Sequence, residues 1–483
     1  MGTISSAFSL ISQALDADQS ALSIVANNVA NANTTGYTEE TPNFVENSPV
    51  TVDGVSSGAG VTETGATSVR DRVLEERLNQ QQQLASASGS RLTALDTLQA
   101  LFTPSSGSSS TAGNIGSDIS SFFSSFSSLE AKPSDSSLRQ AVLSAATTLA
   151  GDISSAADSV NAQRSALDQE AAGVTGQVNA LTSAIAQLNL QIESTSPDAD
   201  AGTLEDQRQQ DLSQLSQLIG INQITTENNG LSVTTASGQL LVSGGSNFQL
   251  TTGTVGGVTD FFVGTTNITS GLTSGGGKLG GYLTARDQDI PGVLSSLDTL
   301  AYDISTAVNT QNNAGTDLDG NTGVAVPPSA VASSLDIFSA PPNLATGSAT
   351  GSAAAMSVVM TDPNEISAAA LGQGSGDSTN AAAMANLANQ AIVGSQTAIN
   401  YYSNFVTALG STVSGVQTEN TAQNASVTQL QTQNDALSSV NLNDEASTLQ
   451  QFERSYQAAS QVFTILNTIM ASALNLGDQT AVS

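Results

Sequence analysis

Apolar residues near the start of the chain recur at alternating spacings of four and three. This is the a/d pattern of a coiled-coil helix, in which one seam of side chains faces a partner helix. Only Asp18 interrupts the seam, and Asn and Thr residues collect before Gly36, so we expect this helix to end near 30–33. The N-terminal seam comprises Ile4, Phe8, Ile11, Leu15, Leu22 and Val25.

The end of the chain carries a second seam with the same period. It comprises Leu449, Phe452, Tyr456, Ala459, Phe463, Leu466, Met470 and Ala473. Short isolated helices are marginally stable in water, so each seam needs a partner, and the simplest partner for each is the other. A two-helix clamp in any soluble protein would give the same pattern. The position at the two extreme ends favours helices that order when the chain joins an assembly.

The middle of the chain alternates helical and strand-like stretches. Helical periodicity covers 70–102, 138–193, 285–312 and 379–437, and the second of these predicts a rod roughly 80 Å long at 1.5 Å per residue. Alternating Val and Thr with many Gly predicts strands over 221–282, and a Gly-, Ala- and Pro-rich stretch over 320–374 predicts a small β domain.

The order of these elements predicts a mainly α protein with some β structure and three domains. The first is a discontinuous terminal coiled-coil domain of 1–66 plus 438–483. The second is a mostly helical rod domain of 67–315 plus 375–437, with a β insert at about 221–284. The third is a small β-rich outer domain of 316–374.

Composition excludes several classes of function. The formal net charge is −31, from 42 acidic and 11 basic residues, whereas nucleic-acid binding and anionic membrane surfaces require Lys and Arg. The chain contains no Cys, His or Trp, which removes thiol nucleophiles, the commonest general base and a common sugar-stacking side chain. The start lacks a basic, apolar signal sequence, and no apolar run could span a membrane.

The run 275–278 partly matches a phosphate-binding loop. Such a loop has Gly six positions before its Lys and Ser or Thr after it, but here Leu272 and Leu279 stand there. We interpret the run as a glycine-rich turn before a helix.

Asp317, Asp319 and Asn321 match the first ligands of a calcium loop. The sixth and twelfth positions should be Gly and Glu, but they are Thr322 and Pro328, so we favour a polar turn. A Ser–Lys pair would have only Lys132 and Lys278 to draw on. We therefore expect no catalytic residues, no metal and no cofactor.

The segment after the first seam reads ANNVANANTTGY and closely resembles the N-terminal signature shared by flagellar rod, hook and hook-associated proteins. This family usually continues with Ser-Arg-Gln, but here Tyr37 is followed by Thr38, Glu39 and Glu40. The matching positions, which we take as the N-terminal assembly motif, are Ala26, Asn27, Asn28, Val29, Ala30, Asn31, Asn33, Thr34, Gly36 and Tyr37.

The C-terminal stretch VNLNDEA, followed by Leu449 and YQAAS, resembles a second signature of the same family. In the middle, 118–164, 276–289, 308–323 and 376–387 resemble its hook-associated members. The resemblance covers nearly all of the chain and is weaker over 230–271 and 324–352.

The resemblance implies a structural subunit exported unfolded through the growing flagellum, without cleavage of a signal peptide. It implies a tubular layer at the hook–filament junction, outside the cell, with the terminal helices innermost. The expected partners are copies of the chain, the hook protein, hook-associated protein 3, and an export chaperone that holds the C-terminal helix.

Two other classes remain open from the sequence. The chain could be another axial protein, a hook or distal rod protein, although long helices at 138–193 and 379–437 argue against a hook protein, which is mostly β between its termini. It could also be an adhesin or enzyme on a flagellar frame, which would need a large inserted domain, and the middle here is short.

Overall fold

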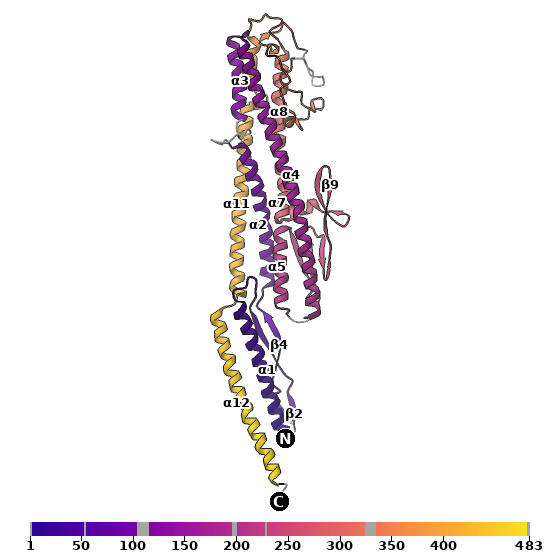
Figure 1. The fold of residues 1–483 in the computed structure, drawn as a ribbon, viewed down its shortest axis with the longest axis vertical. Coiled ribbons are helices and arrows are strands. Elements are labelled where there is room, and N and C mark those ends of the chain that lie inside the picture. Colours follow the sequence, from indigo (N-terminus) through magenta and orange to yellow (C-terminus); the bar gives the residue numbers. More distant parts are fainter. Residues whose placement is uncertain are drawn as a thin grey trace.

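The protein is a long rod built mainly from helices that run along its length, with small antiparallel sheets on its side (Figure 1). This computed structural model describes residues 2–52, 55–103, 115–195, 200–227, 229–323 and 335–480. The mainly α class with some β structure is therefore confirmed. None of the helices among these residues is apolar over a stretch long enough to cross a membrane.

The terminal segments form one end of the rod. Helix α1 (Gly2–Asn31) and helix α12 (Leu442–Thr480) run antiparallel, and both termini lie at this end (Figure 1). The expected end of the first helix near 30–33 agrees with α1. Helix α12 begins after Asn441, whose side-chain oxygen accepts a hydrogen bond from the Asn443 backbone N–H at 3.0 Å.

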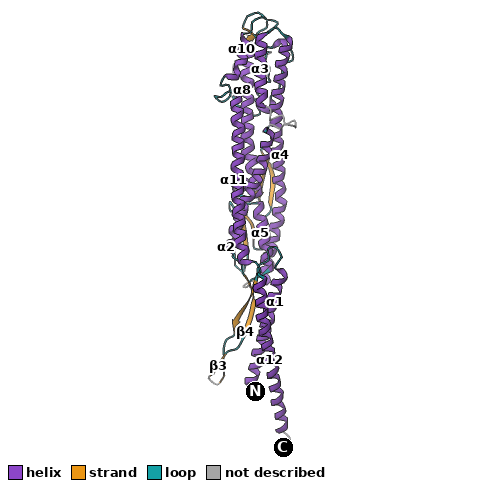
Figure 2. Ribbon diagram, turned by 90° about the vertical axis from the view of Figure 1, so that its left-hand side faces the viewer, coloured by secondary structure: helices purple, strands orange, loops and turns teal. Residues whose placement is uncertain are grey.

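A long β-hairpin accompanies the terminal helices (Figure 2). Strand β1 (Glu40–Glu46) pairs with β4 (Val61–Ser68), and β2 (Val50–Val52) pairs with β3 (Val55–Ser57). No hairpin was expected at this position from the sequence. Strands β1 and β4 are mostly exposed and polar, so they lack the alternation that marks a half-buried strand.

The rod is a bundle of long helices. Helix α2 (Arg72–Phe102) lies beside α11 (Ala398–Ser438), and α3 (Ile115–Ala131) lies beside α4 (Ser136–Thr195). The predicted helix over 138–193 is confirmed, because α4 has 60 residues, or about 90 Å at 1.5 Å per residue. Helix α5 (Thr203–Leu218) folds back along α4, and α8 (Ile290–Asn313) completes the core.

The β insert packs on the side of α4. A four-stranded sheet joins β5 (Ile221–Thr225), β6 (Leu231–Thr235), β7 (Leu240–Ser243) and β8 (Ser246–Asn247). A three-stranded sheet joins β9 (Leu250–Val255), β10 (Val258–Val263) and β11 (Thr266–Asn267). The Asn179 amide of α4 both donates to and accepts from the Leu250 backbone at 2.8 Å.

The insert was expected to reach 284, but its strands end at Asn267. Helices α6 (Thr269–Gly275) and α7 (Gly277–Thr284) follow, and a π-helical turn (Ala285–Asp289) leads into α8. The glycine run is a packing element: Gly276 and Gly277 have φ of 93° and 72°, and a Cβ on Gly277 would lie 2.5 Å from Ile219 backbone atoms. Lys278 lies over the Tyr282 ring, 5.4 Å from its centre.

The far end of the rod contains less strand than expected. In the described part of 316–374, the paired strands are β12 (Gly315–Thr316) and β13 (Ala369–Ala370), beside α9 (Ser352–Ala355) and 3₁₀ turns at Leu344–Thr346 and Pro363–Glu365. Helix α10 (Thr379–Asn386) and a 3₁₀ turn at Leu387–Asn389 follow. The expectation of a β-rich segment here is wrong for these residues.

Side-chain amides replace strand partners in this region. The Asn309 amide of α8 donates to the Phe338 carbonyl at 2.8 Å and accepts from the Ile337 and Phe338 N–H groups. Asn312 bonds the backbone of Leu335 and Ser367 in the same way. At the start of this segment, the Asp317 carboxylate accepts backbone bonds from Asp319 and Asn321, which forms a turn closed by Gly320 at φ 89°.

Candidate assembly site at the terminal helices

The two predicted seams face each other within one chain. The rings of Phe8 and Phe463 are 4.5 Å apart between centres, and Phe44 of the hairpin lies 6.1 Å from Phe452. Val25 is fully buried, whereas most other seam side chains are only half-buried and Tyr456 is exposed. Ile4 and Ala473 lie in α1 and α12, but their side chains are outside the described part. A single chain thus covers its seams incompletely.

Asp18 is the polar interruption in the seam, and the structure buries it. Its side chain is 9% exposed, and its Oδ2 atom has no hydrogen-bond partner among the described residues. Small neighbours surround the same level of α1, where Ala17 and Ala21 are buried. The carboxylate is thus enclosed at a level where several consecutive turns of α1 are buried.

Asn28 of the N-terminal motif lies in α1, and its side chain connects α1 with the turn before β1, with β1 itself and with α12. Its amide nitrogen donates to the Glu40 carbonyl and to the Glu445 carboxylate, both at 2.8 Å. Its amide oxygen accepts from the Tyr37 hydroxyl at 2.8 Å and from the Glu40 N–H at 3.0 Å. The side chain is 1% exposed, so all four of its hydrogen-bonding positions are used away from water.

Glu445 belongs to the C-terminal signature, and it reaches Asn28 from the first turns of α12. Burial raises the pKa of its carboxyl group, the charges of Glu39 and Asp444 raise that pKa further, and the Asn28 hydrogen bond opposes them. Burial likewise raises the pKa of the Tyr37 hydroxyl, with Glu40 adding to the effect. The two signatures therefore meet at one buried polar contact.

The motif ends in a tight turn at Gly36. The Thr34 N–H donates to the Asn31 carbonyl and the Tyr37 N–H to the Thr34 carbonyl, at 2.8 and 3.1 Å. Gly36 has a φ of 79°, and a Cβ there would lie 2.3 Å from the Gln210 amide nitrogen. That amide donates to the Thr35 carbonyl at 2.8 Å, so the turn is fastened to α5 of the rod.

Most of the other motif residues are exposed, on the last turns of α1 and on the turn that follows it. Ala26, Asn27, Val29, Ala30, Asn33 and Thr34 are exposed, and Asn31 is half-buried. The Asn31 amide donates to Asn27, and the Thr34 hydroxyl donates to the Asn31 oxygen. Of the motif side chains, Asn28 and Tyr37 point into the structure, and the rest are left on the surface.

Thr38 links the motif to the rod domain. Its N–H and its hydroxyl both donate to the Asp206 carboxylate, at 3.1 and 2.8 Å. Arg70, whose side chain is 6% exposed, pairs with Asp206 and, at 3.4 Å, with Glu205. Sequence reasoning missed this cluster because Arg70 is far along the chain from the adjacent residues Glu205 and Asp206.

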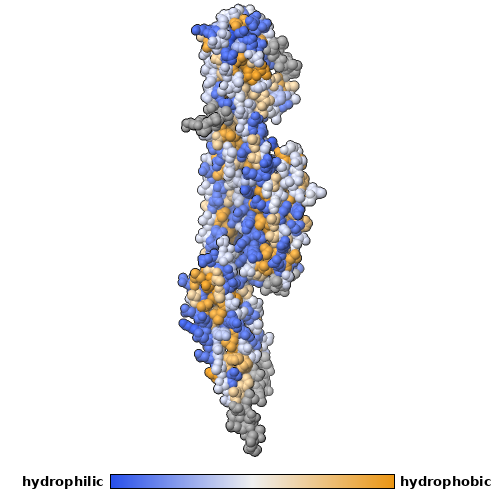
Figure 3. All heavy atoms as spheres, in the orientation of Figure 1, coloured by the Kyte–Doolittle hydropathy of each residue, from blue (hydrophilic) through white to orange (hydrophobic). Residues whose placement is uncertain are grey.

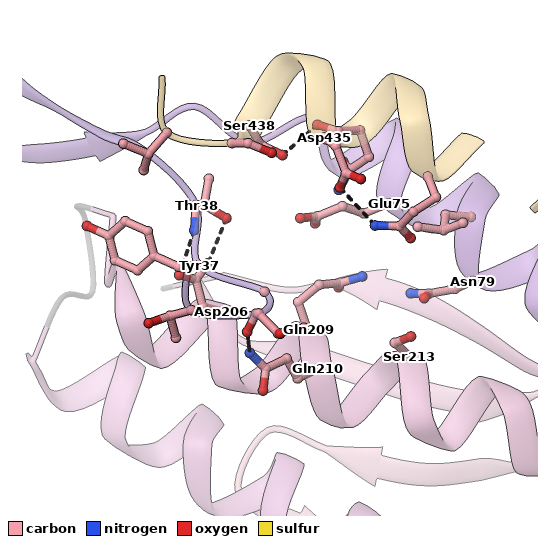
Figure 4. Close-up of a pocket in the computed structure, with 18 of the residues that line it drawn as sticks. Tyr37, Thr38, Glu75, Asn79, Asp206, Gln209, Gln210, Ser213, Asp435 and Ser438 are labelled. Carbon is pink, nitrogen blue, oxygen red and sulfur yellow. Dashed lines mark hydrogen bonds between the residues drawn. The ribbon is translucent and has the colours of Figure 1, made fainter. Parts of the chain in front are cut away.

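A polar cleft of about 620 Å³ opens beside this link, between the turn 32–38, α2, α5 and the end of α11 (Figure 4). Burial raises the pKa of Glu75 in its wall to about 7, Asp206 adds to the rise, and Arg70 opposes it. Asn79 at its edge is 1% exposed, and neither end of its amide has a partner among the described residues. The terminal unit and the rod thus meet across polar surfaces.

Known proteins share both the local motif and the whole architecture. Residues 105–326 match the family "Flagellar hook-associated protein FlgK helical domain", and residues 12–38 match "Flagella basal body rod protein". Over 96% of its length the chain is 26% identical to flagellar hook-associated protein 1 of Salmonella typhimurium, covering 98% of that protein. It is 25% identical to the protein of the same name in Bacillus subtilis, over 96% of each chain.

A solved structure, that of the flagellar hook junction protein FlgK from Burkholderia pseudomallei, has the same fold. The TM-score is 0.63 at 19% identity, and the match covers 74% of this chain and 99% of the other. Fold, motif and sequence together define a flagellar axial protein, a class of structural components and not of enzymes. Within that class, the chain is a relative of flagellar hook-associated protein 1, FlgK.

Proposed function

We propose that this protein is a structural subunit of the junction between the flagellar hook and the filament. The observation that carries the proposal is the match to hook-associated protein 1 along 96% of the chain, with almost the whole of the relative covered. The alternative of a hook or distal rod protein is disfavoured, because the helical-domain family of FlgK matches 105–326, the part in which axial proteins differ.

The subunit polymerises through its terminal unit, α1, the hairpin and α12. Three observations support this. The seams are only half covered within one chain, the outer face of α12 leaves Val462, Ile465 and Ile469 exposed, and most residues of the assembly motif lie on the surface at the other end of α1. Exposed apolar side chains on a narrow helical unit favour burial against neighbours.

The remaining partners follow from the position of such a subunit. The layer contacts the hook protein on one side and hook-associated protein 3 on the other, and an export chaperone holds α12 beforehand. The chain leaves the cell unfolded, without a cleaved signal peptide, and the absence of Cys means that no disulfide can trap it on the way. It carries no catalytic role and takes no metal or cofactor.

Deletion of the gene tests the proposal. Electron micrographs of the deletion strain should show hooks that lack filaments, and expression of the full chain should restore the filaments. Filaments of normal length on the hooks of the deletion strain would contradict a role at the junction. Loss of the hooks themselves would indicate a hook or rod protein instead.

A further inference from the structure

The charges of the terminal unit are distributed very unevenly. Segments 1–68 and 439–483 contain eleven carboxylate residues and a single cation, Arg454. Copies that pack through such segments repel each other unless carboxylates are neutralised across the contact. Arg454 is the one side chain in these segments that can do this.

Arg454 is placed for an external partner. It is exposed on α12, and no salt bridge found in the described part of the chain includes it. It stands two positions from both Phe452 and Tyr456, which at 3.6 residues per turn places it on the face opposite the seam. Val462, Ile465 and Ile469, which are 42%, 58% and 46% exposed, share that outward side. We call these four residues the α12 outer face. Hydrophobic and hydrophilic atoms are mixed on the surface at the terminal end of the rod (Figure 3).

A carboxylate lies at the same level on α1. The Phe8–Phe463 and Asn28–Glu445 contacts fix the antiparallel alignment, and Asp16 and Arg454 both fall between them. Asp16 is exposed. Gln13 and Ser20 bond Asn47 and Glu63 of the hairpin, and Asp16, three positions after Gln13 and four before Ser20, borders this hairpin side of α1. Asp16 also shares a row with the exposed Gln19 and Ser23, away from the seam.

We propose that Arg454 of one copy pairs with Asp16 of the next copy, with the α12 outer face packed on the free side of the neighbouring α1. The inference rests on the proposed function, because it needs copies arranged side by side. An Arg–carboxylate pair flanked by apolar contacts is shielded from water, which makes it stronger than a fully exposed pair. The same pair recurs at every contact between copies, so a modest effect per pair becomes a large effect on the layer.

Charge exchange in the deletion strain tests the pair. Wild-type chain retained on isolated hooks is the reference, and its absence there would count against the proposed function alone. Arg454→Glu and Asp16→Lys should each lower retention roughly tenfold, since each replaces an attraction with a repulsion at every contact. The double exchange should recover most of it, and Arg454→Lys should stay near wild type. Normal retention of Arg454→Glu, or a double exchange no better than its parents, would overturn the pair.

Cross-linking gives a second readout that does not depend on assembly yield. The chain has no Cys, so Asp16→Cys and Arg454→Cys can be placed in separate copies and expressed together. Oxidation of assembled flagella should yield covalent dimers, because the two thiols then lie on adjacent copies. Glu453→Cys is exposed one position away and serves as the matched control, with few dimers expected. Equal yields from positions 453 and 454 would overturn the proposed register.

Discussion

The Asn28 amide donates a hydrogen bond of 2.8 Å to the Glu445 carboxylate across 417 positions of sequence. This contact brings together the two signatures by which the flagellar family is recognised, one at each end of the chain. It lies where α1 ends and α12 begins, next to the link between Thr38 and Asp206. The terminal unit is thus closed at its rod end by buried polar bonds and along its length by apolar seams.

Replacement of Asn28 by Asp should loosen the terminal unit. The change keeps the shape of the side chain but removes both donors and sets a second carboxylate against Glu445. Loss of buried hydrogen bonds together with an unpaired buried charge costs on the order of 3 kcal/mol or more. Hydrogen exchange should rise over α1 and α12 while the rod helices keep their protection. The exposed neighbour substitution Asn27→Asp is the control, and equal exchange in both variants would show that Asn28 has no special role.

Gly36→Val should block docking on hooks while export continues. A β-branched side chain at a φ of 79° costs roughly 1–2 kcal/mol or more, and its Cβ would also collide with Gln210. A closed layer repeats this cost in every copy. The measurement compares subunit in the medium with subunit on isolated hooks.

A second substitution separates strain from collision at Gly36. The double variant Gly36→Ala, Gln210→Ala lacks the amide that would collide with the new Cβ but keeps the unfavourable backbone conformation at position 36. It should therefore dock better than Gly36→Ala alone and less well than the wild type. Gly36→Val protein that docks like wild type would show that the turn does not require glycine.

Acidic substitutions in the C-terminal seam should prevent assembly without unfolding the rod. Phe463→Asp and Leu466→Asp each place a charge in the seam with α1, at a cost of several kcal/mol for an unpaired buried charge. The readouts are filament formation in a complemented strain and the melting temperature of the rod. Thr464→Asp, on the exposed side of α12, is the control. Motile cells carrying the Phe463→Asp, Leu466→Asp double variant would exclude the seam as an assembly surface.

The rod should lose stability as the pH rises toward neutrality. Burial raises the pKa of Asp118 on α3 to about 7, and the hydrogen bond and charge of Asp152 on α4 add to the rise. Because the folded-state pKa exceeds the unfolded value of 3.8, this contribution is fully present below pH 3.8 and is lost as the pH rises through about 7. Glu75, raised to about 7 by burial, has the same sign.

Asp118→Asn isolates this effect, because the amide cannot ionise. Its melting temperature should fall less than that of the wild type between about pH 5 and pH 8. The exposed Asp96→Asn substitution on α2 should leave the wild-type slope intact. Equal slopes in all three proteins would mean that the carboxyl pair does not titrate with folding.

The spacing of apolar residues was sufficient to predict single helices. The α1 and α12 seams and the length of α4 follow from apolar spacing, which depends on residues close together in sequence. The hairpin over 40–68 was missed because β1 and β4 are mostly exposed on both faces. The far end was misjudged because Asn309 and Asn312 bond its backbone, and no spacing rule reveals such long-range partners.

The site shows the same division. Asn28 and Gly36 could be identified from the motif, because a helix end and a turn have local signatures. The roles of Asp206, Arg70 and Gln210 depend on how the rod folds back beside the turn, so no local sequence pattern indicates them. The replacement of the usual Ser-Arg-Gln by Thr38, Glu39 and Glu40 pointed to this region, and Thr38 proves to be the residue that binds Asp206.

The position of the protein along an isolated flagellum tests the central claim most directly. Immunogold labelling of hook–filament complexes, with the tag placed in the exposed turn 372–376 at the far end of the rod, locates the subunit. A role at the junction predicts a single band of label between hook and filament in strains that express the tagged chain and swim normally. Label spread along the hook, confined to the rod or continuous along the filament would contradict it.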